Sequence, residues 1–248
     1  MPFLDHLEEL RWRIIYSLIG IVVGLAVGLY CAFGFDLIAL LQQPVIPYLG
    51  TNKLVILRPM DAFSIRVQIA FVIGLVIAAP IIVYQLWAFM SPALHKPERR
   101  VMVPVLFSAA ILFVGGVALA WFFVLPISLK WLHDLAGTSL QTMYTATDYF
   151  GFATNLALAF GIAFELPLVL VALSALGIVS ARMLNKSRKF AIVGIFIGAA
   201  IISPGDAITV TVTLAVPLYL LYEMSVVIAY FIERKRNARK AREEIAAA

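Results

Sequence analysis

Long, nearly uncharged apolar runs constrain this chain more than any other feature of its sequence. Four of them, at about 14–35, 65–89, 101–127 and 150–177, reach the roughly 20 residues that a helix needs to cross a bilayer. Two more cover Phe190–Ser203 and Ala207 to about Ile232, separated by the turn-forming Pro204-Gly205-Asp206. All six runs are too long and too apolar for strands of a membrane barrel, so we expect helices.

The composition excludes a water-soluble fold. Hydrophobic residues make up 63% of the 248 residues and charged residues 13%, whereas a soluble domain is about half apolar and about one quarter charged. So few charged side chains cannot cover a soluble exterior, and we predict an all-α integral membrane protein. The single cysteine, Cys31, rules out an intrachain disulfide and a thiolate metal site. We expect no cofactor and no metal.

The distribution of lysine and arginine predicts the orientation. Fifteen of the nineteen lie in 1–13, 90–100, 178–189 and 233–248, and four lie in the alternate segments: Lys53, Arg58, Arg66 and Lys130. Because cytoplasmic loops carry the excess of basic residues, both termini are predicted to be cytoplasmic. The loops near 36–64, 128–149 and 204–206 then face outward. The net charge of +5 reflects topology and anionic lipid rather than nucleic acid.

We expect one six-helix domain over residues 1–233 and a basic cytoplasmic tail over 234–248. The apolar stripe of Phe3, Leu7, Leu10 and Ile14 predicts an amphipathic interfacial helix at about 3–13. The last two helices are expected to be short, since fourteen residues reach only about 21 Å. They form either a re-entrant hairpin or spans beside a locally thinned bilayer.

Prolines and small residues inside the spans predict bends and close contacts. Bends are expected at Pro80, Pro104, Pro126, Pro167 and Pro217. Close helix packing is expected at Gly74, Ala78, Gly115, Gly116, Gly161, Gly194 and Gly198.

Glu165, near the middle of the fourth span, is a functional candidate. A charge there costs about 2.5–3.5 kcal/mol on insertion scales. Helical spacing places it on one face with Thr154, Leu158 and Gly161. The alternative is a protonated carboxyl bonded to a neighbouring helix. Glu223, in the sixth span, either has a function or simply reaches the interface.

Two further glutamates lie outside the spans, and each has an ordinary structural explanation. Glu9 and Arg13 are spaced to pair at i,i+4. Glu98 follows Pro97 and suits the positive end of a helix dipole.

Five segments along the chain carry a family resemblance. They are His6-Leu7-Glu8-Glu9-Leu10-Arg11, Tyr84-Gln85-Leu86-Trp87-Ala88-Phe89, Pro92-Ala93-Leu94 with Glu98-Arg99-Arg100, Ala159-Phe160-Gly161-Ile162-Ala163-Phe164-Glu165-Leu166-Pro167, and Ser203-Pro204-Gly205-Asp206. Together they resemble TatC, the polytopic subunit of the twin-arginine protein translocase. The resemblance implies six helices in a cupped arrangement in the bacterial cytoplasmic (inner) membrane, with both termini in the cytoplasm.

The resemblance also implies a function and its residues. The expected protein is a receptor for signal peptides with two consecutive arginines, in a machine that exports folded proteins with the proton-motive force. The expected signal-binding residues are Glu9, Arg11, Leu94 and Glu98, with Gln85 nearby, and Glu165 matches the family's intramembrane glutamate.

The resemblance further implies partners. Single-span TatA and TatB subunits are expected to dock beside the fifth and sixth helices, within a hetero-complex that contains several copies of this chain. The docking candidates are Ser203, Asp206, Thr209 and Thr211. Many relatives carry glutamine where this chain has Val210, which weakens that assignment.

The chemistry of arginine explains the paired acidic residues. Its planar guanidinium matches a carboxylate bidentately, so Glu9 and Glu98 would each take one arginine of the signal. The main alternative is a secondary transporter or ion carrier with Glu165 as a proton or cation site. An intramembrane enzyme is disfavoured, because no G-x-S-x-G or H-E-x-x-H motif occurs and His6, His95 and His133 lie outside the spans.

Overall fold

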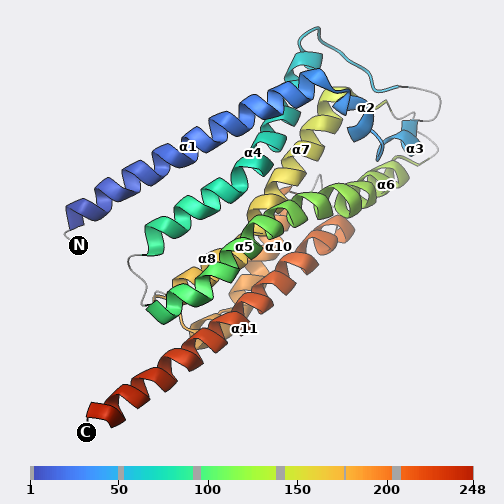
Figure 1. Ribbon diagram of the computed structural model, residues 1–248. Coiled ribbons are helices and arrows are strands. Elements are labelled where there is room, and N and C mark those ends of the chain that lie inside the picture. The colour runs from blue at the N-terminus through green and yellow to red at the C-terminus, as the bar shows by residue number, and fades with distance from the viewer. Residues whose placement is uncertain are drawn as a thin grey trace.

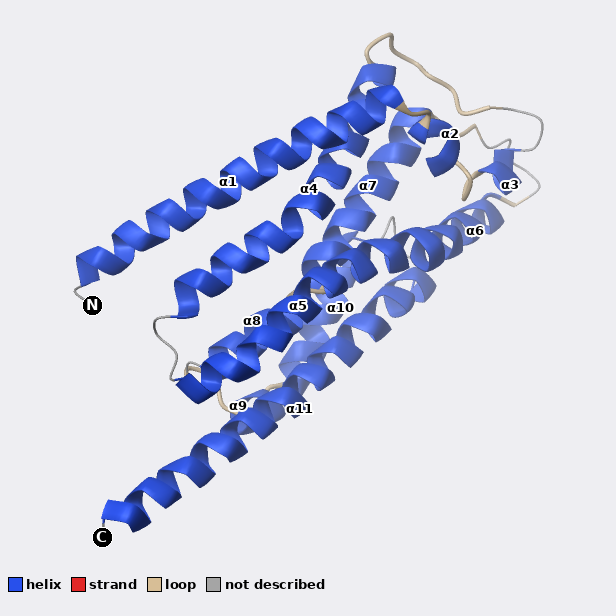
Figure 2. Cartoon of the chain, in the orientation of Figure 1, coloured by secondary structure: helices blue, strands red, loops and turns tan. Residues whose placement is uncertain are grey.

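The computed structural model describes residues 3–49, 53–91, 96–137, 143–175, 177–202 and 208–247. Within these ranges the side chains of 3–6, 96–107, 175, 202, 208–210, 213, 236 and 239–247 are not described. Nearly all of the described chain is helical (Figure 2). The one extended pairing among these residues is a bridge between Val55 and Thr145.

The helices follow one another in a simple order along the chain (Figure 1). The long ones are α1 (Phe3–Gly34), α4 (Asp61–Met90), α5 (Lys96–Leu119), α6 (Leu125–Ala136), α7 (Ala146–Ala163), α8 (Leu166–Ala175), α10 (Arg188–Ile202) and α11 (Ile208–Ala247). The short ones are α2 (Leu37–Leu41), α3 (Ile46–Leu49) and α9 (Ala181–Lys186).

Five segments of the described chain are long and apolar enough to cross a membrane. They are Leu7–Gly34, Asp61–Met90, Ser108–Ala136, Ala146–Ser174 and Leu214–Lys235. The prediction of an all-α membrane protein is confirmed. The sixth apolar helix, α10, has only 15 residues, and at 1.5 Å per residue it reaches about 22 Å. A count of six spans therefore stays a prediction.

One expectation about helix extent needs correction. α11 is not short: it continues for 40 residues, because the basic tail extends the helix beyond the apolar run. The amphipathic stretch at 3–13 forms the first turns of α1, since no proline or glycine lies between Phe3 and Gly20. Its position at the membrane interface stays a prediction.

The span formed by α7 and α8 lies at the centre of the packing. Half of its most apolar stretch is buried inside the protein, whereas only 17% of the corresponding stretch of α1 is buried. α7 packs against α4 and α5, α8 packs against α11, and α1 packs mainly against α4. α1 therefore lies at the periphery, whereas 44% of the apolar stretch of α11 is buried.

Two prolines divide long spans, as their chemistry requires. Pro126 has no N–H and its ring collides with the carbonyl four residues earlier. The chain accommodates it with a π-helical segment, Ala120–Val124, between α5 and α6. Pro167 has a stronger effect, because α7 ends at Ala163 and α8 begins at Leu166.

Glycines allow α1 and α4 to touch backbone to backbone. A Cβ at Gly24 or Gly28 would collide with the carbonyl oxygen of Gly74 or Ala70. A Cβ at Gly74 would lie 2.8 Å from the Leu25 backbone nitrogen. The prediction of close packing at Gly74 is confirmed, and the contribution of Gly24 and Gly28 was not predicted.

The other predicted glycine contacts divide into two groups. Gly116 and Gly161 hold α5 against α7: a Cβ at Gly116 would lie 2.6 Å from the Phe160 carbonyl oxygen, and one at Gly161 would lie 3.0 Å from the Phe113 ring. At Gly115, Gly194 and Gly198 an added Cβ would lie within 4 Å of no atom of the described residues, so the predicted contacts are not found there.

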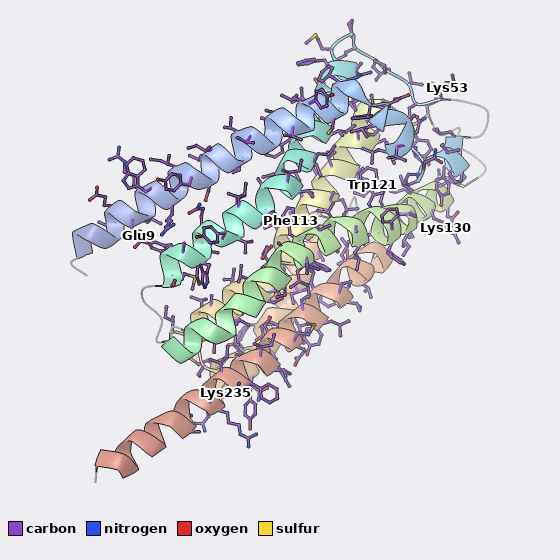
Figure 3. The ribbon with its side chains drawn as sticks, in the orientation of Figure 1. Glu9, Lys53, Phe113, Trp121, Lys130 and Lys235 are labelled. Atoms are coloured by element: carbon purple, nitrogen blue, oxygen red, sulfur yellow. The ribbon has the colours of Figure 1, made fainter. Side chains whose placement is uncertain are left out.

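Both termini lie at one end of the bundle (Figure 1). Figure 3 places Glu9 and Lys235 toward that end, and Lys53 and Lys130 at the opposite end. α2 and α3 lie at the opposite end (Figure 1). There the Tyr149 hydroxyl donates to the Leu41 carbonyl at 2.7 Å, across 108 residues of chain.

Candidate functional site

Arg13 connects two of the sequence-predicted site residues. Its guanidinium donates to Glu9 Oε1 at 3.0 Å and to Gln85 Oε1 at 3.2 Å. Glu9 and Arg13 lie one turn apart on α1, and Gln85 lies near the end of α4. The three side chains form a polar network between the first turns of α1 and the last turns of α4, at the end of the bundle that holds both termini (Figure 3).

Local structure explains why these residues meet. Glu9 and Arg13 are four residues apart, so helical geometry places their side chains on the same face of α1. The close contact of α1 with α4 brings Gln85 within reach of the Arg13 guanidinium. Arg13 has more donors than the Glu9 carboxylate uses, so one guanidinium serves both helices.

The network is partly exposed. Side-chain exposure is 22% for Glu9 and 29% for Arg13. Among the described residues only Arg13 bonds to the Glu9 carboxylate. The carboxylate is therefore accessible from solvent to a guanidinium that competes with Arg13.

The remaining residues predicted to bind the signal are less fully placed. Arg11 is exposed on α1, two residues from both Glu9 and Arg13, and so lies on a different face of the helix. Glu98 belongs to the first turn of α5, but its side chain lies outside the described part of the structure. Leu94 falls outside the described residues altogether. The end of α4 and the beginning of α5 nevertheless lie at the same end of the bundle as the N-terminus (Figure 2).

Glu165 lies at the break between α7 and α8. Both of its carboxylate oxygens are buried and accept no hydrogen bond from any described residue. The alternative of a carboxyl bonded to a neighbouring helix therefore finds no donor in the described chain. The preceding residue is apolar and buried: Phe164 is 8% exposed and its ring is tilted against that of Phe160, with 6.1 Å between ring centroids.

The expected shared face of Thr154, Leu158, Gly161 and Glu165 is interrupted. Thr154 and Gly161 belong to α7, but the helix ends before Glu165 because of Pro167. The Thr154 hydroxyl bonds to the Phe150 carbonyl at 2.6 Å and is satisfied within its own helix. Glu165 is therefore presented by a chain break and not by a continuous helical face.

The other polar candidates divide between structural contacts and undescribed positions. Glu223 accepts from Arg188 at 2.8 Å and from the Tyr219 hydroxyl at 2.7 Å, which ties α10 to α11. Thr211 is half-buried in α11. Ser203 and Asp206 fall outside the described residues, and Thr209 is placed by its backbone alone.

Arg13 was not among the residues predicted from the sequence to form the site. The spacing predicted the contact of Arg13 with Glu9, but its bond to Gln85 joins residues 72 positions apart. No local pattern carries that information, because it depends on the register of α1 against α4.

Comparisons with known proteins agree with this architecture. The family model described as "Sec-independent protein translocase protein (TatC)" matches residues 5–217. That match covers most of the chain. The chain belongs to the TatC family.

Relatives and solved structures support the TatC assignment over nearly the full length. The Aquifex aeolicus TatC protein is 38% identical over 96% of this chain and 98% of its own. The Escherichia coli K12 protein is 34% identical over 95% of this chain and 91% of its own. A crystal structure of the "Twin Arginine Translocase Receptor- TatC" shares 37% identity and a TM-score of 0.78, covering 92% of this chain and 99% of that one.

Membership in the TatC family makes this chain a subunit of the Sec-independent, twin-arginine protein translocase. Its apolar helices make it a bacterial membrane protein.

Proposed function

We propose that this chain is the signal-peptide receptor of the translocase and that Glu9 binds one arginine of the twin-arginine pair. The observation that carries the proposal is the Glu9–Arg13–Gln85 network. In it a guanidinium of the chain itself already occupies the Glu9 carboxylate, at a hydrogen-bonding distance of 3.0 Å.

A signal arginine would use the same geometry as Arg13. Because Gln85 also accepts from Arg13, this side chain keeps a partner when the signal arginine takes its place on Glu9. The exchange costs little, since an i,i+4 pair on a partly exposed helix contributes only about 0.3–0.5 kcal/mol.

Glu98 is the proposed acceptor for the second arginine. It lies in the first turn of α5, where helix-end dipoles favour a carboxylate. Two carboxylates on different helices would recognise two arginines together, while lysines would lose the bidentate contact. Leu94 is proposed to contact the apolar part of the same signal.

The proposed orientation places this site in the cytoplasm, at the inner membrane. It is supported by the fifteen basic residues in the four predicted cytoplasmic segments and by the position of both termini at one end of the bundle (Figure 1). The chain contains no nucleotide-binding loop motif, and the proton-motive force is the proposed energy source.

Glu165 is proposed to act after binding. A buried carboxylate without a described partner, at a break in the central span, is available to stabilise an inserted signal. TatA and TatB type partners are proposed to dock beside α10 and the start of α11, near Thr211. Several copies of the chain would share the complex.

Site-directed crosslinking tests the receptor assignment. A photoreactive residue replaces Trp12 or Leu94, and a labelled Arg-Arg signal peptide is added to the full chain in membranes. The matched control places the same photoreactive residue at Ile201, which is 80% exposed on α10. We expect crosslinks from positions 12 and 94 that an unlabelled Arg-Arg peptide abolishes and a Lys-Lys peptide does not. Equal capture of both peptides, or equal capture at 201, would refute the assignment.

A further inference from the structure

A groove between α9 and the C-terminal half of α11 has no role in the proposed signal site. It encloses about 670 Å³ and opens to the surface. Its polar part is formed by Arg182, Asn185, Arg188, Arg234 and Asn237. The groove lies where the apolar part of α11 gives way to its basic extension.

Two of the groove arginines are available to a ligand. Arg188 is already paired with Glu223 at 2.8 Å. Arg182 and Arg234 are exposed and make no ion pair with any described residue. The one acidic lining residue, Glu233, accepts from the Ala181 backbone N–H at 2.9 Å, so its charge is directed to the start of α9. The polar part of the groove therefore attracts an anion.

The part of the groove formed by α11 before Glu233 is apolar and aromatic. It consists of Val226, Val227, Tyr230 and Phe231, within the segment Leu214–Lys235 that is apolar enough to cross a membrane. Val227, Tyr230 and Phe231 are each more than half exposed. A ligand that fills this groove meets two cations at one end and hydrocarbon-facing side chains at the other.

The short neighbouring helix explains why such a groove lies at the membrane boundary. α10 begins at Arg188 and spans about 22 Å, less than the ~30 Å hydrocarbon core. If α10 crosses the membrane, the bilayer beside it thins, which draws lipid headgroups toward the level of Arg188. The arginines of the groove lie next to that position.

We propose that this groove binds the phosphate headgroup of an anionic phospholipid, with Arg182 and Arg234 on the phosphodiester and the first part of an acyl chain along Val227, Tyr230 and Phe231. Arginine donors match phosphate oxygens bidentately. A soluble phosphate would use the same arginines but would gain nothing from the apolar wall. The bound lipid would fasten α9 to α11 at the thinned edge of the protein.

Native mass spectrometry of the full chain in detergent tests the proposal. The probes are phosphatidylglycerol and phosphatidylcholine with identical acyl chains. The test variant is the double substitution Arg182→Gln/Arg234→Gln. The matched control is Lys189→Gln/Lys235→Gln, which removes the same charge from exposed positions of α10 and α11 that do not line the groove. Melting curves in detergent establish that both variants are folded.

We expect the groove variant to bind phosphatidylglycerol about 10- to 30-fold more weakly, and the control to bind it like the unmodified chain. Arg182→Lys/Arg234→Lys should retain more binding than the glutamine variant. An equal loss in both glutamine variants, or no loss in the groove variant, would overturn the proposal. Displacement of phosphatidylglycerol by an excess of inorganic phosphate would overturn the lipid assignment in favour of a free anion, and tight binding of phosphatidylcholine would overturn the role of the anionic headgroup.

Discussion

Replacing Glu9 by glutamine should weaken binding of a twin-arginine peptide much more than replacing its neighbour Glu8. Glu9 belongs to the network with Arg13 and Gln85, whereas Glu8, at the preceding position of α1, is exposed. Both substitutions remove one negative charge and preserve the shape of the side chain. Any difference between them therefore measures the specific contact and not the overall field.

The expected magnitude follows from two opposing terms. A hydrogen bond between a guanidinium and a carboxylate contributes about 1.5–3 kcal/mol at a partly dehydrated site. In the unmodified chain the peptide must first displace Arg13 from Glu9, which costs about 0.5 kcal/mol for a pair this exposed. The net loss in Glu9→Gln is about 1–2.5 kcal/mol, or roughly 5- to 70-fold in the dissociation constant.

Arg13→Gln provides an independent check on this reasoning. It removes the competing guanidinium and leaves Glu9 free, so the peptide should bind about twofold more tightly. The benefit is limited because the bond to Gln85 is lost as well, and with it one tie between α1 and α4.

Fluorescence anisotropy of a labelled signal peptide, with the full chain in detergent at low and moderate salt, measures these changes. A Lys-Lys peptide of the same length is the ligand control. If Glu8→Gln and Glu9→Gln weakened binding equally, the effect would be one of surface charge alone. If Arg13→Gln weakened binding as much as Glu9→Gln, the network would be a structural unit and not an arginine-binding site.

Three further predictions concern other parts of the molecule. Glu165→Gln should leave peptide binding unchanged and slow export of a folded reporter by about tenfold or more, and a normal export rate would exclude a role in transport. Gly28→Ala should lower the melting temperature in detergent because its Cβ meets the α4 backbone, whereas Gly115→Ala, which meets open space, should leave it unchanged or raise it. Tyr149→Phe should destabilise the chain by about 1 kcal/mol and speed hydrogen exchange around Leu41, and unchanged exchange there would show that the 2.7 Å bond does not hold α2 in place.

The placement of the helices follows closely from the sequence, because apolar length alone decides which segments enter a bilayer. Every predicted apolar run is helical, and the runs at 101–127 and 150–177 are divided near Pro126 and Pro167, where the missing N–H requires it. The error concerns extent, because α11 continues past Ile232 to Ala247. The carboxylate of Glu223 within it is satisfied by Arg188, a residue of another helix. A local sequence pattern cannot report such a partner.

The candidate site shows the same division. Glu165 could be selected from the sequence, since a charged group inside an apolar span is costly and therefore noticeable. Glu9 and Gln85 were selected through the family resemblance. Their environments could not be derived from it. Nothing local indicates that Arg13 reaches Gln85, or that both Glu165 oxygens lie buried without a described donor.

By itself the sequence determined that this protein lies in a membrane, the order of its helices and the family to which it belongs. These properties depend on hydrophobicity, on proline and glycine chemistry and on motifs, all of which are local along the chain. Only the tertiary structure decided which residues of different helices meet. Examples are the contact of Gly28 with the Ala70 backbone and the groove between α9 and α11. The physical reason is that packing selects one register for each helix pair, and every contact across the pair depends on that choice.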